Sequence, residues 1–425
     1  MFVLVATFVV ALILGVPVAF SLGLAAVAFL AFSDMPLQIL PTIVFGGMDS
    51  FPLMAIPFFI LTGELMSRCG VLPRLMEFAN SIVGHFRGGL GYVNVSASML
   101  FSGVTGVSIA DAAAVGSTLI PSMIREGYPP AFAAALTAAA SVMGAIIPPS
   151  VAMLIIAYIY GGEVSVGTLF LAGATPGVLI GLGLMTYVLV SARRRGFPVS
   201  SGGFSVIEVL YRLRRALAGL LVPVIVLGGI LGGIFTATEA GAIAAAYSFV
   251  LGVVVLRTIG LRDVYEALLS SAKVSAIIFM LLGTAKVVAF VLVTQQVPQQ
   301  LAGAIQQMTS SPQVFLLLVV ALFFLLGFVM EGVATMIMIV PIVVPIAKAF
   351  GVDPHHLCLV IVMTVQIALI TPPVALSLFV TTPMAGCTME QVTPEVAPMV
   401  LIVLGVVVLV VFAPAVAMWL PRVAG

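Results

Sequence analysis

The sequence predicts an all-α polytopic membrane protein made of two structural repeats. Hydrophobic residues make up 62% of the 425 residues, 7% are charged, and the mean hydropathy is +1.32. Water could not cover so much apolar surface, so the chain needs a bilayer as its solvent. Residues 101–154 also align without a gap with residues 325–378. The prolines that coincide are Pro121, Pro130, Pro148 and Pro149 with Pro345, Pro354, Pro372 and Pro373. Matching interruptions in an apolar repeat are typical of secondary transporters.

Long apolar runs predict the membrane spans. We expect spans at roughly 2–32, 52–68, 130–160, 168–191, 216–237, 239–256, 275–294, 355–380 and 396–420. The first is a retained span rather than a signal peptide, because no basic residue precedes it and no small-residue cleavage site followed by polar sequence ends it. The Pro-Pro pairs turn 130–160 and 355–380 into broken helices.

Two further segments, about 86–125 and 313–350, predict re-entrant helical hairpins. In each, short apolar stretches flank a centre rich in small or polar residues. Irregular backbone survives at membrane depth only where protein or a wet cavity satisfies its polar groups. We therefore expect both hairpins to lie inside the protein, near a functional site.

The basic residues predict the orientation. Most of them fall on one face of the proposed spans, which the positive-inside rule makes cytoplasmic: Arg68, Arg74, Arg87, Arg125, Arg193, Arg194, Arg195, Arg212, Arg214, Arg215, Arg257, Arg262 and Lys273. The opposite loops, 33–50 and 295–313, carry no basic residue. The first hairpin then opens to the cytoplasm and the second to the outside, so the repeats are inverted. The expected organisation is a first repeat 1–192, a cytoplasmic basic linker 193–215 that contacts lipid headgroups, and a second repeat 216–425.

The Pro-Pro pairs predict two Na⁺ sites. A proline removes the hydrogen bond to the carbonyl four residues earlier, and hard cations such as Na⁺ bind to carbonyls that are freed in this way. The first site is expected to comprise Ser102, Gly103, Gly144, Ala145, Pro148 and Ser150. The second is expected to comprise Met330, Glu331, Ala368, Leu369, Thr371 and Pro372. The alternative is a plain kink at each pair, in which neighbouring hydroxyls or water satisfy the carbonyls.

The hairpin tips predict a substrate site. Small residues at each tip let the chain reverse, and the helix that follows points its positive dipole end at the tip. An organic anion fits between two such ends. The candidate residues that face the substrate are Thr105, Ser108, Asp111, Gly332 and Thr335. Helix capping is an equally good interpretation of Asp111 and Thr335.

Three charged residues within or beside apolar spans are further candidates: Glu64, Glu239 and Lys286. An ionised group costs about 2.5–3.5 kcal/mol at the centre of a membrane helix on insertion scales, so each should face protein or water. Glu239 is expected to cap the helix that follows it, because it lies at a junction between spans. Lys286 has two candidate partners, Glu64 and another carboxylate of the scaffold.

Several motifs resemble the large membrane subunit of tripartite ATP-independent periplasmic (TRAP) transporters. They are Ser108–Ala114, Ala145–Ser150, Leu169–Gly173 with Pro176 and Gly177, Gly232–Thr236 with Thr238–Ala240, and Ile370–Val374. The resemblance runs nearly end to end. It implies a multi-pass subunit of a bacterial or archaeal inner membrane that imports organic acids with Na⁺. It also implies a small membrane subunit (Q type) and a periplasmic substrate-binding protein (P type) as partners, and an elevator motion of hairpins and broken helices against a scaffold.

One region departs from the family pattern. Where the family often has Asn, Glu and Gly before the second Pro-Pro pair, this chain has Thr364, Gln366 and Ala368. The details of the second ion site are therefore open, although the carbonyls are untouched.

Other functions are excluded or less favoured. A balance of 16 basic and 15 acidic residues argues against a nucleic-acid partner, and three scattered cysteines are too few for a metal cluster. The sequence lacks His-Glu-x-x-His and Gly-x-Gly-Asp motifs and its three histidines lie near span ends, so neither a protease nor a haem subunit is expected. We expect no enzyme activity and no organic cofactor. A passive anion channel and a non-transporting scaffold or sensor remain alternatives. The substrate stays open among C4-dicarboxylates, sialic acids, keto acids and sulfonates.

Inverted repeats make a testable prediction about topology. In a variant without the native cysteines, Gln299→Cys should react with an impermeant thiol reagent from outside the cell. Ser201→Cys should react only when the reagent reaches the cytoplasm, because it follows the basic run of Arg193–Arg195. Labelling of both positions from the same side would contradict the model.

Overall fold

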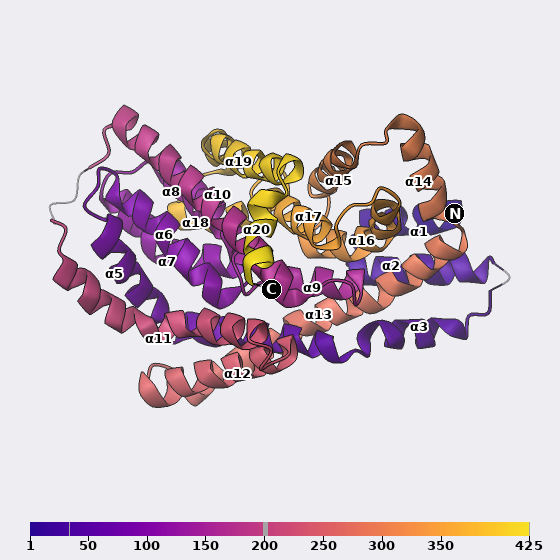
Figure 1. Ribbon diagram of the computed structural model, residues 1–425, viewed down its shortest axis with the longest axis horizontal. Coiled ribbons are helices and arrows are strands. Elements are labelled where there is room, and N and C mark those ends of the chain that lie inside the picture. The colour runs from indigo at the N-terminus through magenta and orange to yellow at the C-terminus, as the bar shows by residue number, and fades with distance from the viewer. Residues whose placement is uncertain (34, 199–202, 425) are drawn as a thin grey trace.

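The computed structural model describes all residues except 34, 199–202 and 425, and the described residues form helices without a β-strand (Figure 1). The helices before residue 199 are α1 (Phe2–Ile13), α2 (Val18–Ala31), α3 (Ile39–Met48), η1 (Phe51–Met54), α4 (Ala55–Arg68), α5 (Val71–Val83), α6 (Gly89–Thr105), α7 (Ser108–Arg125), α8 (Pro130–Ser141), η2 (Val142–Ala145), α9 (Val151–Tyr160) and α10 (Val166–Arg195). Those after residue 202 are α11 (Val206–Leu231), α12 (Ala237–Val250), η3 (Leu251–Val255), α13 (Leu261–Thr294), α14 (Val297–Met308), α15 (Pro312–Leu326), α16 (Gly332–Ala349), α17 (Pro354–Ala368), α18 (Leu376–Ala385), α19 (Met389–Phe412) and α20 (Ala415–Ala424). The predicted all-α class is confirmed.

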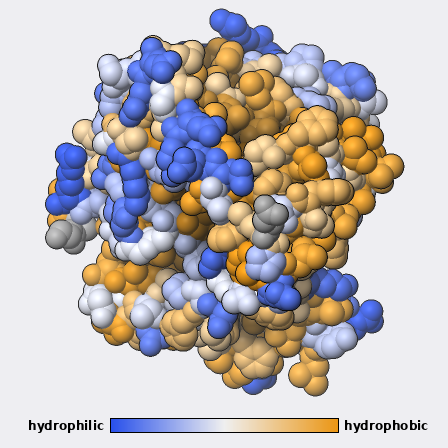
Figure 2. Space-filling model, turned by 90° about the vertical axis from the view of Figure 1, so that its right-hand side faces the viewer, coloured by the Kyte–Doolittle hydropathy of each residue, from blue (hydrophilic) through white to orange (hydrophobic). Residues whose placement is uncertain are grey.

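Six helices of the described chain are long and apolar enough to cross a membrane: α10, α11, α12 continued by η3, α13, α16 and α19. A seventh span results if α3 and the η1–α4 segment, which meet at a bend of 55°, are counted as one. Large apolar side chains also point outward, with Phe2, Ile13 and Phe32 at least 79% exposed. Figure 2 shows hydrophobic residues over much of the N-terminal side, with hydrophilic residues gathered in separate groups. A surface of this kind requires lipid around it.

Some predicted boundaries are wrong. The expected single span 2–32 is two helices, α1 and α2, that pack against each other. Gly15 between them has a φ of +81°, which only glycine adopts without strain, and Pro17 precedes the first residue of α2. The predicted loop 33–50 contains α3, and the predicted loop 295–313 contains α14, whose proline at the start favours a helix. Asp34 of the first loop lies outside the described residues.

Helices extend into both ends of the segment 193–215. The helix α10 ends at Arg195, and Gly196 follows in the left-handed conformation that commonly ends a helix. The helix α11 begins after Ser205, whose hydroxyl accepts a hydrogen bond from the amide of Glu208. Arg212 and Arg215 lie on α11 and pair with Glu77 of α5. Position 201, named in the topology prediction, lies outside the described residues.

Two helical hairpins and two broken helices form the centre of the molecule. The first hairpin is α6 and α7, and the second is α15 and α16. One helix is interrupted between η2 and α9, around Pro148 and Pro149, and the other between α17 and α18, around Pro372 and Pro373. The second part of each broken helix packs on the opposite repeat. The helix α18 packs on α7 and α8, while α9 packs on α16 and α17 (Figure 1). We call residues 89–160 and 312–385 together the hairpin core. It contacts α4 and α13, which we call the frame helices.

The tight packing of α10 on the first break predicts the effect of one methyl group. A Cβ atom at Gly173 would lie 2.4 Å from the carbonyl oxygen of Ile146 and 2.3 Å from the Met153 methyl carbon. Gly173→Ala should therefore destabilise the protein by about 1–3 kcal/mol, because the backbone of the break cannot move away easily. The readout is the melting temperature in detergent. The matched control is Gly228→Ala in α11, where a Cβ meets no atom within 4 Å; equal melting temperatures for the two variants would contradict the packing argument.

Candidate functional site

A cavity of about 680 Å³ lies between the hairpin core and the frame helices. The first hairpin contributes Thr105 to Ala110, and the second contributes Glu331 and Val333. The frame helices contribute, among others, Gly63 and Glu64 from α4 and Ile278 and Leu281 from α13. Both breaks and α17 complete the wall with Ala145, Val151, Gln366 and Leu369. Its volume falls in the range of about 300–1,000 Å³ that is typical of small-molecule sites.

The tip of the first hairpin is seated on the first break. Gly106 has a φ of +67°, and a Cβ there would lie 2.7 Å from the carbonyl oxygen of Pro149, so only glycine fits. The amide of Val151 donates a hydrogen bond to the Gly106 carbonyl at 3.1 Å. On the other side of the tip, a Cβ at Gly63 of α4 would lie 2.9 Å from the carbonyl oxygen of Thr105. The backbone of the frame therefore approaches the tip directly.

Asp111 is the centre of a buried polar cluster in the first hairpin. Its side chain is fully buried and accepts hydrogen bonds from the hydroxyls of Ser102, at 2.9 Å, and Thr105. Gly144 lies against it, because a Cβ there would be 2.5 Å from the carboxylate. The interpretation of Asp111 as a helix cap is wrong, because the N-cap of α7 is Val107, which makes no side-chain capping bond.

The first break brings together part of the predicted ion site. Ser102 and Gly144 meet at Asp111, and a Cβ at Gly103 would lie 3.5 Å from the carbonyl oxygen of Pro148. The carbonyl of Ala145, however, accepts a hydrogen bond from the Ser150 hydroxyl at 2.7 Å. This one carbonyl is therefore satisfied as in a plain proline kink, in which a neighbouring hydroxyl replaces the lost amide donor.

The second tip and break are closed by bonds within the chain. Glu331 caps α16, with its carboxylate accepting from the amides of Val333 and Ala334 at 2.9 Å each. Thr335 is not the N-cap, and its hydroxyl donates to the Glu331 carbonyl at 3.0 Å. Gly332 approaches α17, because its Cβ would lie 2.3 Å from Val365.

Backbone donors occupy the carbonyls that were expected to be free at this second break. The carbonyl of Leu369 accepts from the amide of Ser377 at 2.9 Å, and that of Ala368 accepts from the amide of Thr371 at 3.3 Å. Met330 at the second tip is buried, and Pro372 lies within the break itself. The two breaks therefore differ in the donors to their carbonyls, which are a serine hydroxyl at the first break and backbone amides at the second.

One contact joins the two repeats at the cavity wall. The Ser108 hydroxyl, at the start of α7, donates to the side-chain oxygen of Gln366 in α17 at 2.8 Å. Ser108 was a predicted site residue, whereas Gln366 was noted only as a departure from a family pattern. Nothing in the sequence places residues 258 positions apart next to each other.

The three embedded charges have separate roles. Glu239 caps α12 in a capping box with Thr236, as predicted. The predicted pairing of Lys286 with Glu64 is wrong, because Lys286 donates to the carbonyl of Gly46 at 2.6 Å. Lys286 is thereby directed toward α3 rather than toward the cavity.

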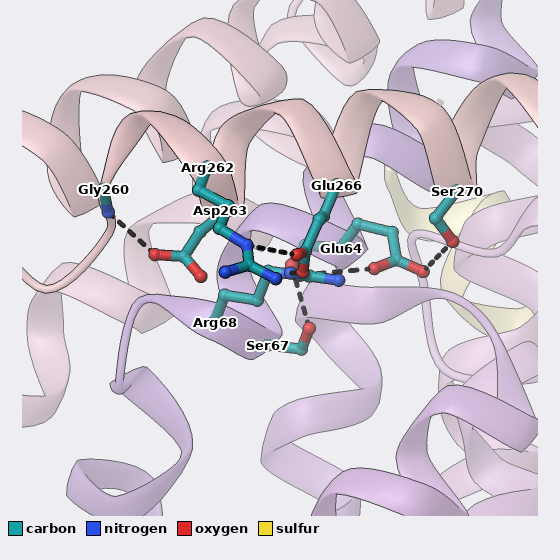
Figure 3. Close-up of polar contacts among 8 residues, drawn as sticks. All are labelled: Glu64, Ser67, Arg68, Gly260, Arg262, Asp263, Glu266 and Ser270. Atoms are coloured by element: carbon teal, nitrogen blue, oxygen red, sulfur yellow. Dashed lines mark hydrogen bonds and ion pairs between the residues drawn. The ribbon is translucent and has the colours of Figure 1, made fainter.

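Glu64 joins the two frame helices instead (Figure 3). Its carboxylate accepts from the Ser270 hydroxyl of α13 at 2.9 Å and lies 3.8 Å from Arg68. Arg68 in turn donates to Glu266 of α13 at 3.0 Å, and Arg262 donates to the same carboxylate at 3.1 Å. These contacts link α4 to α13 at one end of the cavity.

The helical fold, the apolar surface and the cavity between hairpins and frame define a multi-pass membrane transporter. The family model "Tripartite ATP-independent periplasmic transporter, DctM component" matches residues 5–416, so the chain belongs to this family of large TRAP permease subunits. It is a multi-pass protein of the bacterial inner membrane and not an enzyme.

Individual relatives agree with this assignment. The chain is 41% identical to the C4-dicarboxylate TRAP transporter large permease protein DctM of Pseudomonas aeruginosa, covering 95% of this chain and 94% of the relative. It is 36% identical to the sialic acid TRAP transporter large permease protein SiaM of Vibrio cholerae, covering 96% and 95%. The solved YdaH transporter of Alcanivorax borkumensis has a similar fold, with a TM-score of 0.66, 16% identity and coverage of 97% and 98%.

The buried carboxylate of Asp111 predicts a cation effect that needs no transport assay. A buried charge without a counterion is costly, so a cation beside Asp111 should stabilise the fold. Raising NaCl in place of choline chloride should increase the melting temperature of the purified protein, and Asp111→Asn should remove most of that increase. Glu239→Gln, at an exposed cap, is the control and should keep it. An equal Na⁺-dependent increase in Asp111→Asn would exclude a cation at this carboxylate.

Proposed function

We propose that this chain carries an organic acid across the inner membrane together with Na⁺, and that it receives the acid from a periplasmic binding protein. The cavity between the two hairpin tips and the frame helices carries the proposal, because it joins elements of both repeats around one small-molecule space. Binding at the junction of two repeats, next to interrupted helices, is the arrangement expected of a secondary transporter.

Na⁺ as the coupling ion is supported by the oxygen atoms of the first hairpin. Asp111, Ser102 and Thr105 offer a carboxylate and two hydroxyls beside the backbone of Gly144. Hard cations prefer oxygen ligands of this kind. Each Na⁺ that enters down a potential of 100 mV supplies about 2.3 kcal/mol, which is available to concentrate an organic anion.

An elevator motion is supported by the way the elements pack. The hairpin core is held together across the two repeats by the packing of α9 and α18 on the opposite repeat and by the bond from Ser108 to Gln366. The frame helices α4 and α13 are joined to each other by Arg68, Glu266 and the bond from Ser270 to Glu64. In the proposal the hairpin core moves as one body along the frame, carrying the cavity from one side of the membrane to the other.

The family and its characterised members support a proposal for the partners and the substrate class. TRAP transporters are tripartite, so we propose a small membrane subunit and a periplasmic binding protein as the other two parts. The relatives above are described as transporting C4-dicarboxylate and sialic acid, both of which carry carboxylates. A carboxylate-bearing acid is therefore the proposed substrate.

Reconstitution in proteoliposomes tests this function. With the small subunit and a loaded binding protein, uptake of succinate or N-acetylneuraminate should require an inward Na⁺ gradient. Omitting the binding protein, or replacing Na⁺ by choline, should leave little uptake, because delivery or the driving force is lost. Equal flux without a Na⁺ gradient would indicate a passive anion channel and overturn the proposal.

A further inference from the structure

The frame helices line the cavity with polar side chains at one end and apolar side chains along the rest. The residues that they contribute are Ile60, Gly63, Glu64 and Ser67 from α4 and Val274, Ile277, Ile278 and Leu281 from α13. Glu64 bonds to Ser270, which lies one turn before Val274. Leu281 lies about 16 Å beyond Ser270 along the same helix, at 1.5 Å per residue. The polar end, formed by Glu64 and Ser67, is therefore well separated from the apolar end.

Two arginines mark the side of the membrane to which this polar end belongs. Arg68 follows Ser67 at the end of α4, and Arg262 lies at the start of α13 (Figure 3). Arg68 donates to Glu266 of α13 at 3.0 Å, so the two helix ends lie side by side. The positive-inside rule assigns an end of this kind to the cytoplasmic side.

Glu64 brings a negative charge to the cavity wall. Its side chain is 29% exposed, and its carboxylate accepts from the Ser270 hydroxyl at 2.9 Å. Arg68 is 3.8 Å away and makes its shorter contact, at 3.0 Å, with Glu266, so it balances the charge of Glu64 only in part. Among the described residues that line the cavity none is basic, and the other acid, Glu331, is held by the amides of α16.

The proposed motion brings the organic acid next to this charge at one stage only. The frame stays fixed while the hairpin core moves along it, and in this structure the cavity borders Glu64. Movement of the core toward the outside takes the cavity beyond Leu281 and away from Glu64. An organic anion beside a carboxylate is destabilised, because like charges repel more strongly in a protein interior than in water. The affinity for the acid should therefore be lower at the cytoplasmic end of the frame than at the outer end.

We infer that Glu64 is a release charge of the frame: it weakens the binding of the organic acid when the cavity is at the cytoplasmic end, and it does not affect binding from the outside. This inference rests on the proposed function and assigns to it a residue that favours release. Ser270 and Arg68 position the carboxylate of Glu64. The Na⁺ gradient still supplies the driving force, and Glu64 determines only how readily the acid leaves.

Inhibition of uptake by substrate inside the vesicles tests this role. Proteoliposomes contain the large and small subunits, and the loaded binding protein is added outside only, so that uptake reports transporters whose periplasmic face is outward. Uptake of labelled succinate or N-acetylneuraminate is measured against graded internal concentrations of the same unlabelled acid. Glu64→Gln should lower the internal concentration that halves uptake about tenfold, because the repulsion is lost. The external KM should stay unchanged.

Two further variants change the charge at the same place. Glu64→Asp keeps the carboxylate, so its internal half-inhibitory concentration should stay within about twofold of the wild-type value. Ser67→Asp adds a second carboxylate at the polar end of the cavity and should raise that concentration about threefold. If the melting temperature in detergent shows that Glu64→Gln does not fold, Ser67→Asp decides the question alone.

Controls make the outcomes distinct. Glu126→Gln removes an exposed carboxylate outside the cavity and should leave both the internal value and the external KM unchanged. An unchanged internal value in folded Glu64→Gln, or an equal shift of the external KM, would overturn the inference while wild-type uptake still supported the proposed function. A higher Na⁺ requirement in Glu64→Gln would make Glu64 an ion ligand and overturn it as well. Absence of Na⁺-dependent uptake of both probes by the wild type would instead remove the proposed function, and the inference with it.

Discussion

Backbone amides and carbonyls that lose their helical hydrogen bonds inside a membrane protein need new partners, because lipid offers none. This constraint governs the centre of the molecule. At the first break, the Ser150 hydroxyl satisfies the carbonyl of Ala145, and the amide of Val151 bonds to Gly106 in the neighbouring hairpin tip. At the second break, the amide of Ser377 reaches back to Leu369. The first interruption is therefore held partly by the neighbouring hairpin tip, whereas the second is closed by a bond across its own break.

The same requirement produces an asymmetry between two repeats of similar sequence. A glutamate caps the helix that follows the second tip, and its carboxylate takes up the amides that would otherwise face the cavity. At the first tip the acidic residue lies three positions inside the helix and turns toward hydroxyls of α6, the other helix of the hairpin, leaving the helix end uncapped. One hairpin thus has a buried carboxylate that accepts from two hydroxyls and an uncapped helix end, whereas the other is closed on itself.

Much of the fold was predictable because it depends on local pattern. Hydropathy predicted the helical class, and the position of Glu239 at a span junction predicted that it caps the following helix. The helices α3 and α14 were missed because each is short, has a proline in its first turn and lacks a long apolar run. The predicted pair of Lys286 and Glu64 failed because the partner of a charge is set by helix rotation, which hydropathy does not specify. Asp111 was a predicted site residue, but its partners Ser102 and Thr105 could be paired with it only once the turn at Gly106 was known.

The sequence by itself determined the solvent, the helical class, the internal repeat and the positions of the interruptions, because composition and proline act locally on hydration and on the helix hydrogen bonds. Only the tertiary structure decided which freed carbonyls find donors and which helix ends stay open. It also decided that Gln366 meets Ser108 across the two repeats. These outcomes depend on distances between segments far apart in the chain, and such distances are set by the packing of α9 and α18 against the opposite repeat rather than by any local pattern.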